Sequence, residues 1–246
     1  QNEGRADAAG GGTASPRAEP AGAPWPVERR RRGRDWRRAG LRANRLNRAS
    51  TRRLREVRRV SEVRAEIGQP APDFEGEAVR WNPRKKEFEY LAVNLAQNRK
   101  RSLWTVLFFY PRDFSGLCPT EIHAFNRRLA DFEQAGAQVI GCSTDSKQSH
   151  QAWMERPRTR GGIDKLGYPL LEDPSLRISR AYGVLDERAG MALRGSFIID
   201  DEGVVRAYSV YPAGTGRNID EIVRLLQALQ TGKTCPAGWR PGRKTL

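Results

Sequence analysis

The chain has 246 residues, of which 38% are hydrophobic and 30% are charged, and its formal net charge is +15. This length and apolar content are enough for one large domain or two small ones with a sizeable core. No apolar stretch approaches the roughly 18 residues that a membrane-spanning helix needs, so we expect a soluble protein. The three cysteines, Cys118, Cys142 and Cys235, are too few and too scattered for a disulfide framework, which indicates an intracellular protein with redox chemistry.

Most of the positive charge lies in residues 1–66, which contain 18 arginines, no lysine and 8 acidic residues. We expect the residues up to Pro26 to be disordered. They have almost no large apolar side chains, whose burial would offset the entropy lost on ordering. Among the arginines that follow, Leu54, Val57 and Val60 recur at helical spacing. Such a leader is typical of a mitochondrial or plastid transit peptide. The alternatives are a solvated basic tail on a cytoplasmic protein and an arm that binds nucleic acid.

Strand and helix patterns alternate in residues 67–246. Apolar and alternating runs predict strands at residues 87–94, 104–110, 138–143, 168–171, 196–200 and 204–211. Helical spacing predicts helices at residues 118–134, 147–155, 175–182 and 219–229. An early parallel crossover, a later hairpin and a closing helix predict a thioredoxin-like α/β fold, with a central mixed sheet flanked by helices. The tail of residues 230–246 is rich in Gly and Pro and is not expected to be helical.

The most informative stretch is Pro111 to Glu121, which joins the predicted strand 104–110 to the predicted helix 118–134. Cys118 therefore lies in the first turn of a helix, at the carboxyl end of a strand. Unpaired backbone N–H groups and the positive end of the helix dipole meet there, and both favour a thiolate over a thiol. This arrangement predicts a reactive cysteine.

The spacing of Pro111, Ser115 and the run Cys118-Pro-Thr-Glu121 resembles the active-site signature of the peroxiredoxins, specifically the typical two-cysteine branch of the AhpC/TSA-like thiol peroxidases. Other segments resemble this family in the expected order: Ile67–Phe74, which is similar to its opening strand, then Ser143–Ser146, Ser149–Trp153, Arg194–Asp200, Gly216–Asn218 and Cys235–Trp239. The resemblance covers about residues 67–246 and leaves residues 1–66 outside. It implies a peroxidase domain that reduces hydrogen peroxide and small organic hydroperoxides.

The resemblance also implies a role for each residue of the motif. Cys118 would attack the peroxide, and Arg194 would stabilise the negative charge that builds on the departing oxygen. Ser115 would hydrogen-bond the peroxide, and Pro111 would shield the thiolate from water. Taken alone, Arg194 would be read as a solvated surface arginine.

Glu121 and Arg217 match a supporting pair of the family, in which the carboxylate holds the arginines near the sulfur. A carboxylate three residues from a thiolate needs such cationic partners, because like charges repel. The alternative for Glu121 is a first-turn acid that compensates the helix dipole.

The resemblance implies that Cys235 is the resolving cysteine. Its attack on the Cys118 sulfenic acid would give an inter-subunit disulfide, which a thioredoxin-like dithiol then reduces. This implies a homodimer, or a ring of such dimers. Because the segment Tyr211–Asn218 looks more like the one-cysteine branch, resolution by an external thiol stays open. Two further roles also stay open: a holdase role for the assembly, and nucleic-acid binding through the basic extension.

The remaining titratable residues give no sign of a further site. Cys142 follows an apolar strand and is expected in the core. His123 and His150 have no metal-ligand partner at useful spacing, so neither a metal nor a cofactor is predicted. A thioredoxin-type disulfide reductase is excluded, because Glu121 stands where the second cysteine of Cys-x-x-Cys would be.

Overall fold

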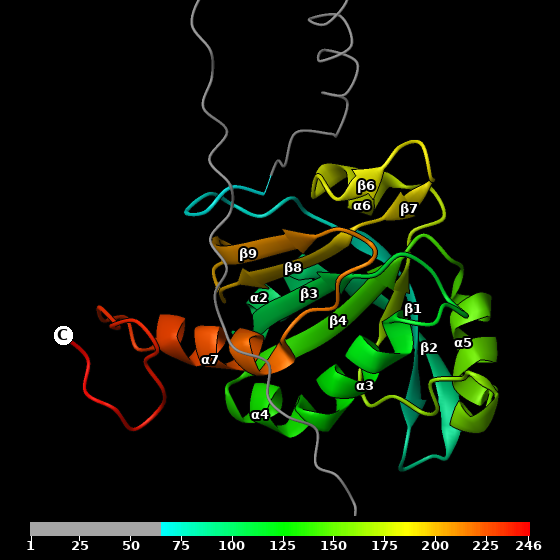
Figure 1. Ribbon diagram of the computed structural model, residues 1–246, viewed down its shortest axis with the longest axis horizontal. Helices are drawn as coiled ribbons and strands as arrows, with labels where there is room; N and C mark the ends of the chain where they lie inside the picture. The colour runs from blue at the N-terminus through cyan, green and yellow to red at the C-terminus, as the bar shows by residue number, and fades with distance from the viewer. Residues whose placement is uncertain (1–64) are drawn as a thin grey trace, which may run out of the picture. The chain divides into compact units, whose positions relative to one another are not determined.

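The computed structural model describes residues 65–246, and the predictions made for residues 1–64 lie outside this range. A seven-stranded sheet forms the centre of this part of the chain, with the strand order β2-β1-β5-β4-β3-β8-β9 (Figure 1). The β3–β4 and β4–β5 pairs are parallel, and the other pairs are antiparallel. The sheet is therefore mixed, and its parallel strands lie at its centre.

The strands of this sheet are β1 (Glu75–Asn82), β2 (Glu87–Asn94), β3 (Trp104–Phe109), β4 (Ala137–Ser143), β5 (Leu170–Glu172), β8 (Arg194–Ile199) and β9 (Val205–Tyr211). A separate short hairpin pairs β6 (Leu185–Asp186) with β7 (Met191–Ala192). The helices are α2 (Leu95–Lys100), α3 (Cys118–Arg127), α4 (Leu129–Gln134), α5 (Lys147–Glu155), α6 (Arg177–Ala181) and α7 (Ile219–Gln230), with a 3-10 turn, η1 (Arg158–Arg160). Side-chain caps begin three of these helices: Asn94 on α2, Ser146 on α5 and Asn218 on α7.

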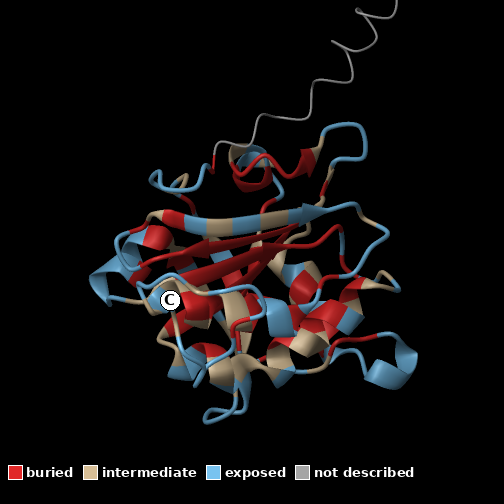
Figure 2. Ribbon diagram, turned by 60° about the vertical axis from the view of Figure 1, so that its left-hand side comes forward, coloured by how far each residue is buried: buried red, intermediate tan, exposed pale blue. Residues whose placement is uncertain are grey.

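The sheet has a hydrophobic core on each of its two faces, because successive side chains of β3 point to opposite sides. Val106 and Phe108 pack with apolar residues of α3, α4, α5 and α7. Leu107 and Phe109 pack on the other face with residues of α2 and α6. The central strands are accordingly buried, whereas β9 at the sheet edge exposes much of its surface (Figure 2). The ring of Phe108 stacks on that of Phe125 with centroids 3.9 Å apart, which anchors α3 to β3.

The predicted mixed α/β, thioredoxin-like fold is confirmed, but two predicted elements are wrong, and β1 and α2 were not predicted. The first is the single helix over residues 118–134, which is interrupted at Arg128. The backbone there has φ −98° and ψ 9°, outside the helical region. Arg128 pairs with the carboxylates of Asp131, at 2.7 Å, and of Asp220. The helical pattern therefore divides into α3 and α4.

The second wrong detail is the opening strand at Ile67–Phe74, which is absent from the described part of the chain. Pro70 and Pro72 lack the N–H groups that a ladder needs, and Gly68 has a left-handed φ of +81°. The segment instead runs beside β9 through one isolated bridge between Pro70 and Val204. The strand that does open the sheet, β1, comes directly after it.

Candidate active site

Cys118 is the first residue of α3, directly after the loop that leaves β3. Pro119 occupies the first turn, and the capping residue Leu117 makes no side-chain cap. No side chain therefore competes for the first backbone N–H groups of α3. These groups and the helix dipole place positive potential at the sulfur.

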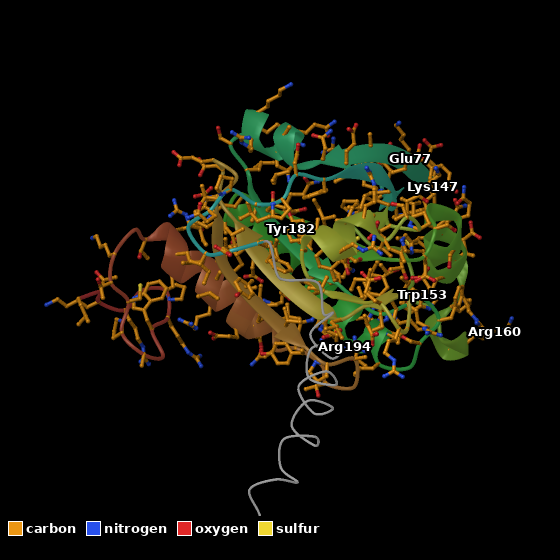
Figure 3. The ribbon with its side chains drawn as sticks, turned by 90° about the horizontal axis from the view of Figure 1, so that it is seen from above. Glu77, Lys147, Trp153, Arg160, Tyr182 and Arg194 are labelled. Atoms are coloured by element: carbon orange, nitrogen blue, oxygen red, sulfur yellow. The ribbon has the colours of Figure 1, made fainter. Side chains whose placement is uncertain are left out.

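Arg194 connects the sulfur to a buried carboxylate. It begins β8 (Figure 3), and its Nη1 atom lies 3.4 Å from Cys118 Sγ and 2.5 Å from Glu121 Oε2. Its Nε donates to the carbonyl of Ala213 at 2.8 Å, which fixes the plane of the guanidinium group. The adjacent Gly195 leaves room for this strand, because an added Cβ there would lie 2.7 Å from the Val184 side chain.

Arg217 binds the same carboxylate of Glu121 from the other side. Its Nε and backbone N each lie 2.8 Å from Oε1, and its Nη2 lies 3.0 Å from Oε2. Its Nη1 donates to the carbonyl of Gly195 at 2.6 Å and to Ser196 Oγ at 3.0 Å. Two guanidinium groups thus converge on one carboxylate next to the sulfur.

The electrostatics of this cluster follow from its burial. Burial acts to raise the pKa of Glu121, but the hydrogen bonds and charge of Arg217, together with the charge of Arg194, outweigh it and lower that pKa. Glu121 is therefore ionised, and with both arginines it leaves a net charge of one positive unit. Such a surplus stabilises negative charge that develops near the sulfur.

The loop before Cys118 contributes Pro111 and Ser115. Pro111 is buried, and Ser115 Oγ is buried without a hydrogen-bond partner among the described residues. Cys118 itself is 0% exposed, although Gly116 and Thr120 on either side of it are exposed. The sulfur therefore lies just beneath the surface of this part of the structure.

The structure does not bring Cys235 into this cluster. Cys235 lies beyond α7, half-buried, with its Sγ 3.5 Å from Thr231 Oγ1. It lines a cavity of about 390 Å³ together with residues of α7. Both Cys118 and Cys235 are free thiols.

The sequence reasoning missed a buried polar cluster behind the loop. The carboxylate of Asp113 accepts hydrogen bonds from Tyr110 Oη at 2.9 Å and from His150 Nδ1 and Ser149 Oγ, both at 2.8 Å. His150 matches a position of the resembled family, but its spacing from other residues in the sequence predicted no catalytic or metal-binding role for it. No periodic pattern could have linked residues 113 and 150, which are 37 positions apart.

Neither the third cysteine nor a metal-ligating cluster adds to the site within residues 65–246. Cys142 is buried in β4, and burial, followed by the charge of Asp173, raises the pKa of its thiol well above the usual value. Within residues 65–246, no group of three or more metal-ligating side chains comes together. No helix in the same range is long and apolar enough to cross a membrane.

A free cysteine at a helix N-terminus, next to a strand of a thioredoxin-like sheet and paired with a guanidinium group, defines a thiol-based oxidoreductase. Residues 67–208 match the profile of the AhpC/TSA family. The Bacillus subtilis (strain 168) protein YkuU is 50% identical over 180 residues, which cover 73% of this chain and 97% of YkuU. Peroxiredoxin-2 of Macaca fascicularis is 45% identical over 186 residues, covering 74% and 90% of the two chains.

A solved structure, the reduced 2-Cys peroxiredoxin of Plasmodium vivax, superposes with a TM-score of 0.67 at 37% identity, covering 73% of this chain and 91% of that one. The chain therefore belongs to the AhpC/TSA family. It is a peroxiredoxin, an oxidoreductase that reduces peroxides through a cysteine thiol. Peroxiredoxins act on peroxides and form dimers and higher oligomers.

Proposed function

We propose that Cys118 is the peroxide-attacking residue of this enzyme and that Cys235 resolves the product to an inter-subunit disulfide. The observation that carries the proposal is the 3.4 Å contact between Arg194 Nη1 and Cys118 Sγ, inside a cluster with a positive surplus of charge. This contact supplies a fixed cation where a peroxide O–O bond would break.

In the first step, the Cys118 thiolate attacks the nearer peroxide oxygen. The S–O bond forms as the O–O bond breaks, and the departing oxygen takes the bonding electrons and then a proton, leaving as water or an alcohol. Arg194 stabilises the charge on that oxygen, and Ser115 has an unused hydroxyl with which to bind the peroxide. Glu121 and Arg217 hold Arg194 in place, and Pro111 limits the access of water.

In the second step, the Cys235 thiolate attacks the sulfenic sulfur of Cys118. The S–S bond forms, and hydroxide leaves and is protonated to water. The tail that carries Cys235 hydrogen-bonds to α7 and to itself, and it makes no hydrogen bond with residues 111–127. This supports a partner subunit as the source of the resolving thiol. A thioredoxin-like dithiol then reduces the disulfide by exchange.

The proposed domain organisation follows from this chemistry. Residues 67–246 form the peroxidase domain with its tail of residues 230–246, and residues 1–66 are an Arg-rich extension. If this extension is a transit peptide, the protein belongs to a mitochondrion or plastid; otherwise it is cytoplasmic. The substrates are hydrogen peroxide and small organic hydroperoxides, because a buried sulfur favours small oxidants.

A non-reducing gel after one equivalent of peroxide tests the proposal. Wild type and Cys142→Ser are expected to form a covalent dimer, whereas Cys118→Ser and Cys235→Ser are not. A dimer band in Cys235→Ser would show that another thiol resolves Cys118. Monomeric Cys118 trapped as a mixed disulfide with an added small thiol would favour the one-cysteine mechanism. Peroxide consumption by Cys118→Ser at the wild-type rate would remove Cys118 from the reaction.

A further inference from the structure

We propose that Asp113 and His150 are positioning residues for the peroxide pocket, and that their buried hydrogen bond holds the loop of residues 111–117 in the conformation that keeps the Ser115 hydroxyl available to the peroxide. This inference rests on the proposed function of Cys118 and Ser115. It adds two residues that do not touch the reacting atoms.

Asp113 is the anchor of the loop. Its side chain is 1% exposed, and both carboxylate oxygens are used: Oδ1 by the hydroxyl of Tyr110, and Oδ2 by Ser149 and His150. Its backbone N–H donates to Asp145 Oδ2 at 2.9 Å. One loop residue is thus bonded to the end of β3, to α5 and to the segment after β4, so it has little freedom to shift.

His150 connects this anchor to the sheet. It is 0% exposed, and its Nδ1 lies 2.8 Å from Asp113 Oδ2 while its Nε2 lies 3.3 Å from the carbonyl oxygen of Leu171 in β5. A carboxylate only accepts hydrogen bonds, so Nδ1 is the nitrogen that donates to it. A buried carboxylate that loses such a donor keeps its desolvation penalty, and it shifts toward other partners or toward solvent.

The backbone between Asp113 and Ser115 shows that the loop is held against its own preference. Phe114 has a φ of +54°, in the left-handed region that disfavours residues with a Cβ. Such a conformation persists only when the surroundings impose it. The hydrogen bonds of Asp113 fix the residue before Phe114. The Phe114 ring is also held in place, because it packs against Trp153, with centroids 5.7 Å apart, and under the guanidinium group of Arg156.

The Asp113 anchor and the strained Phe114 together fix the position of Ser115. It follows the strained Phe114, and its buried oxygen has no partner among the described residues. A buried hydroxyl without a partner is costly, and it is common where a ligand supplies the missing hydrogen bond. If the Asp113 anchor were released, Phe114 could relax to a negative φ, and the Ser115 hydroxyl would turn away with it.

The test compares two substitutions of His150 in the full-length protein. His150→Phe keeps a ring but removes the donor to Asp113, whereas His150→Asn keeps an amide N–H close to the position of Nδ1. Two rates are measured for each variant: the second-order rate of Cys118 oxidation by hydrogen peroxide, and the rate of Cys118 alkylation by iodoacetamide. Alkylation depends on the thiolate and on access to the sulfur, but not on a hydroxyl that binds the peroxide, so release of the loop does not slow it.

We expect His150→Phe to slow oxidation by about 10- to 100-fold, the cost of a misplaced binding group, whereas the alkylation rate does not fall. His150→Asn should recover most of the oxidation rate. A folded His150→Phe variant that oxidises at the wild-type rate would overturn the proposal. So would a parallel fall of both rates, because that result indicates a general effect on the thiol or on the fold.

Tyr110→Phe provides a second route to the same answer if His150→Phe does not fold. It removes only the hydroxyl that donates to Asp113 Oδ1. Oxidation by hydrogen peroxide should therefore be slower than in wild type, whereas alkylation should not. An oxidation rate equal to that of wild type, or an equal fall of both rates, would refute the proposal. The Cys118→Ser variant separates the two hypotheses. If it still consumes peroxide, the proposed function fails. If it does not, and His150→Phe matches wild type, only the positioning role fails.

Discussion

The Nη1 atom of Arg194 lies 3.4 Å from Cys118 Sγ, and the same nitrogen lies 2.5 Å from Glu121 Oε2. One guanidinium group therefore faces the sulfur and is held by a carboxylate at the same time. Because the cation is fixed before any oxidant arrives, it can stabilise new negative charge without first reorganising.

Replacing Arg194 by lysine is expected to lower the rate constant for hydrogen peroxide by about 10²–10³-fold, the usual cost of losing one such donor. Lysine keeps the charge but cannot reproduce the arginine fork, which bonds Ala213 through Nε while Nη1 faces Cys118 and Glu121. Stopped-flow oxidation of the reduced enzyme measures the rate. The exposed Arg188, replaced in the same way, is the control and should leave the rate unchanged. A rate for Arg194→Lys close to wild type would contradict the role assigned to Arg194.

Replacing Glu121 by glutamine is expected to lower the free energy of unfolding by about 3–5 kcal/mol, because it leaves two buried guanidinium groups without their counter-charge. Urea denaturation followed by tryptophan fluorescence measures the change. Glu187→Gln is the matched control: it removes one carboxylate of an exposed pair with Arg180 and should change stability little. Equal effects of the two substitutions would show that burial of the Glu121 pair does not matter for stability.

Acid is expected to destabilise the protein in part through Glu121. The pKa of this carboxyl group is lowered in the folded state, so its contribution to stability is complete above its usual value of 4.5 and is lost as the pH falls through the folded value. Unfolding free energies measured from pH 7 down to pH 3 should therefore decline more steeply in wild type than in Glu121→Gln. Parallel curves for the two proteins would argue against a lowered pKa.

Bulky peroxides are expected to react more slowly than hydrogen peroxide. Cys118 is 0% exposed, so a larger oxidant must displace more of the protein around the sulfur to reach it. The rate constants for hydrogen peroxide, tert-butyl hydroperoxide and cumene hydroperoxide should fall in that order. Rates that do not depend on peroxide size would contradict the burial of the sulfur.

The fold was predictable where one local signal dominates. The strand at residues 87–94 and the helix at residues 147–155 were predicted with the bounds that the structure shows, the first from alternating residues and the second from helical spacing. β1 was missed because Glu75–Asn82 mixes charged, small and aromatic residues without a clear period. α2 was missed because six residues are too few to show one.

Part of the candidate site was likewise predictable from local motifs, and part was not. Cys118 and Glu121 were singled out from one motif, and Arg194 and Arg217 from two others. The structure joins the four residues through direct contacts. The contact between Asp113 and His150 left no trace in the sequence, because it depends on how β3 and α5 pack. Tertiary contacts between single polar residues carry no periodic signal, and only coordinates reveal them.

The interruption at Arg128 divides the helical segment of residues 118–134 into α3, which carries the sulfur at its first residue, and α4. Arg128 pairs with Asp131 of α4 and with Asp220 of α7, so the junction of the two helices is fastened to α7. Near its other end, α3 is held by the ion pairs of Glu121, and between the two ends the buried Phe125 stacks on Phe108. The sulfur is therefore mounted on a short segment that is fastened at both ends to the rest of the domain.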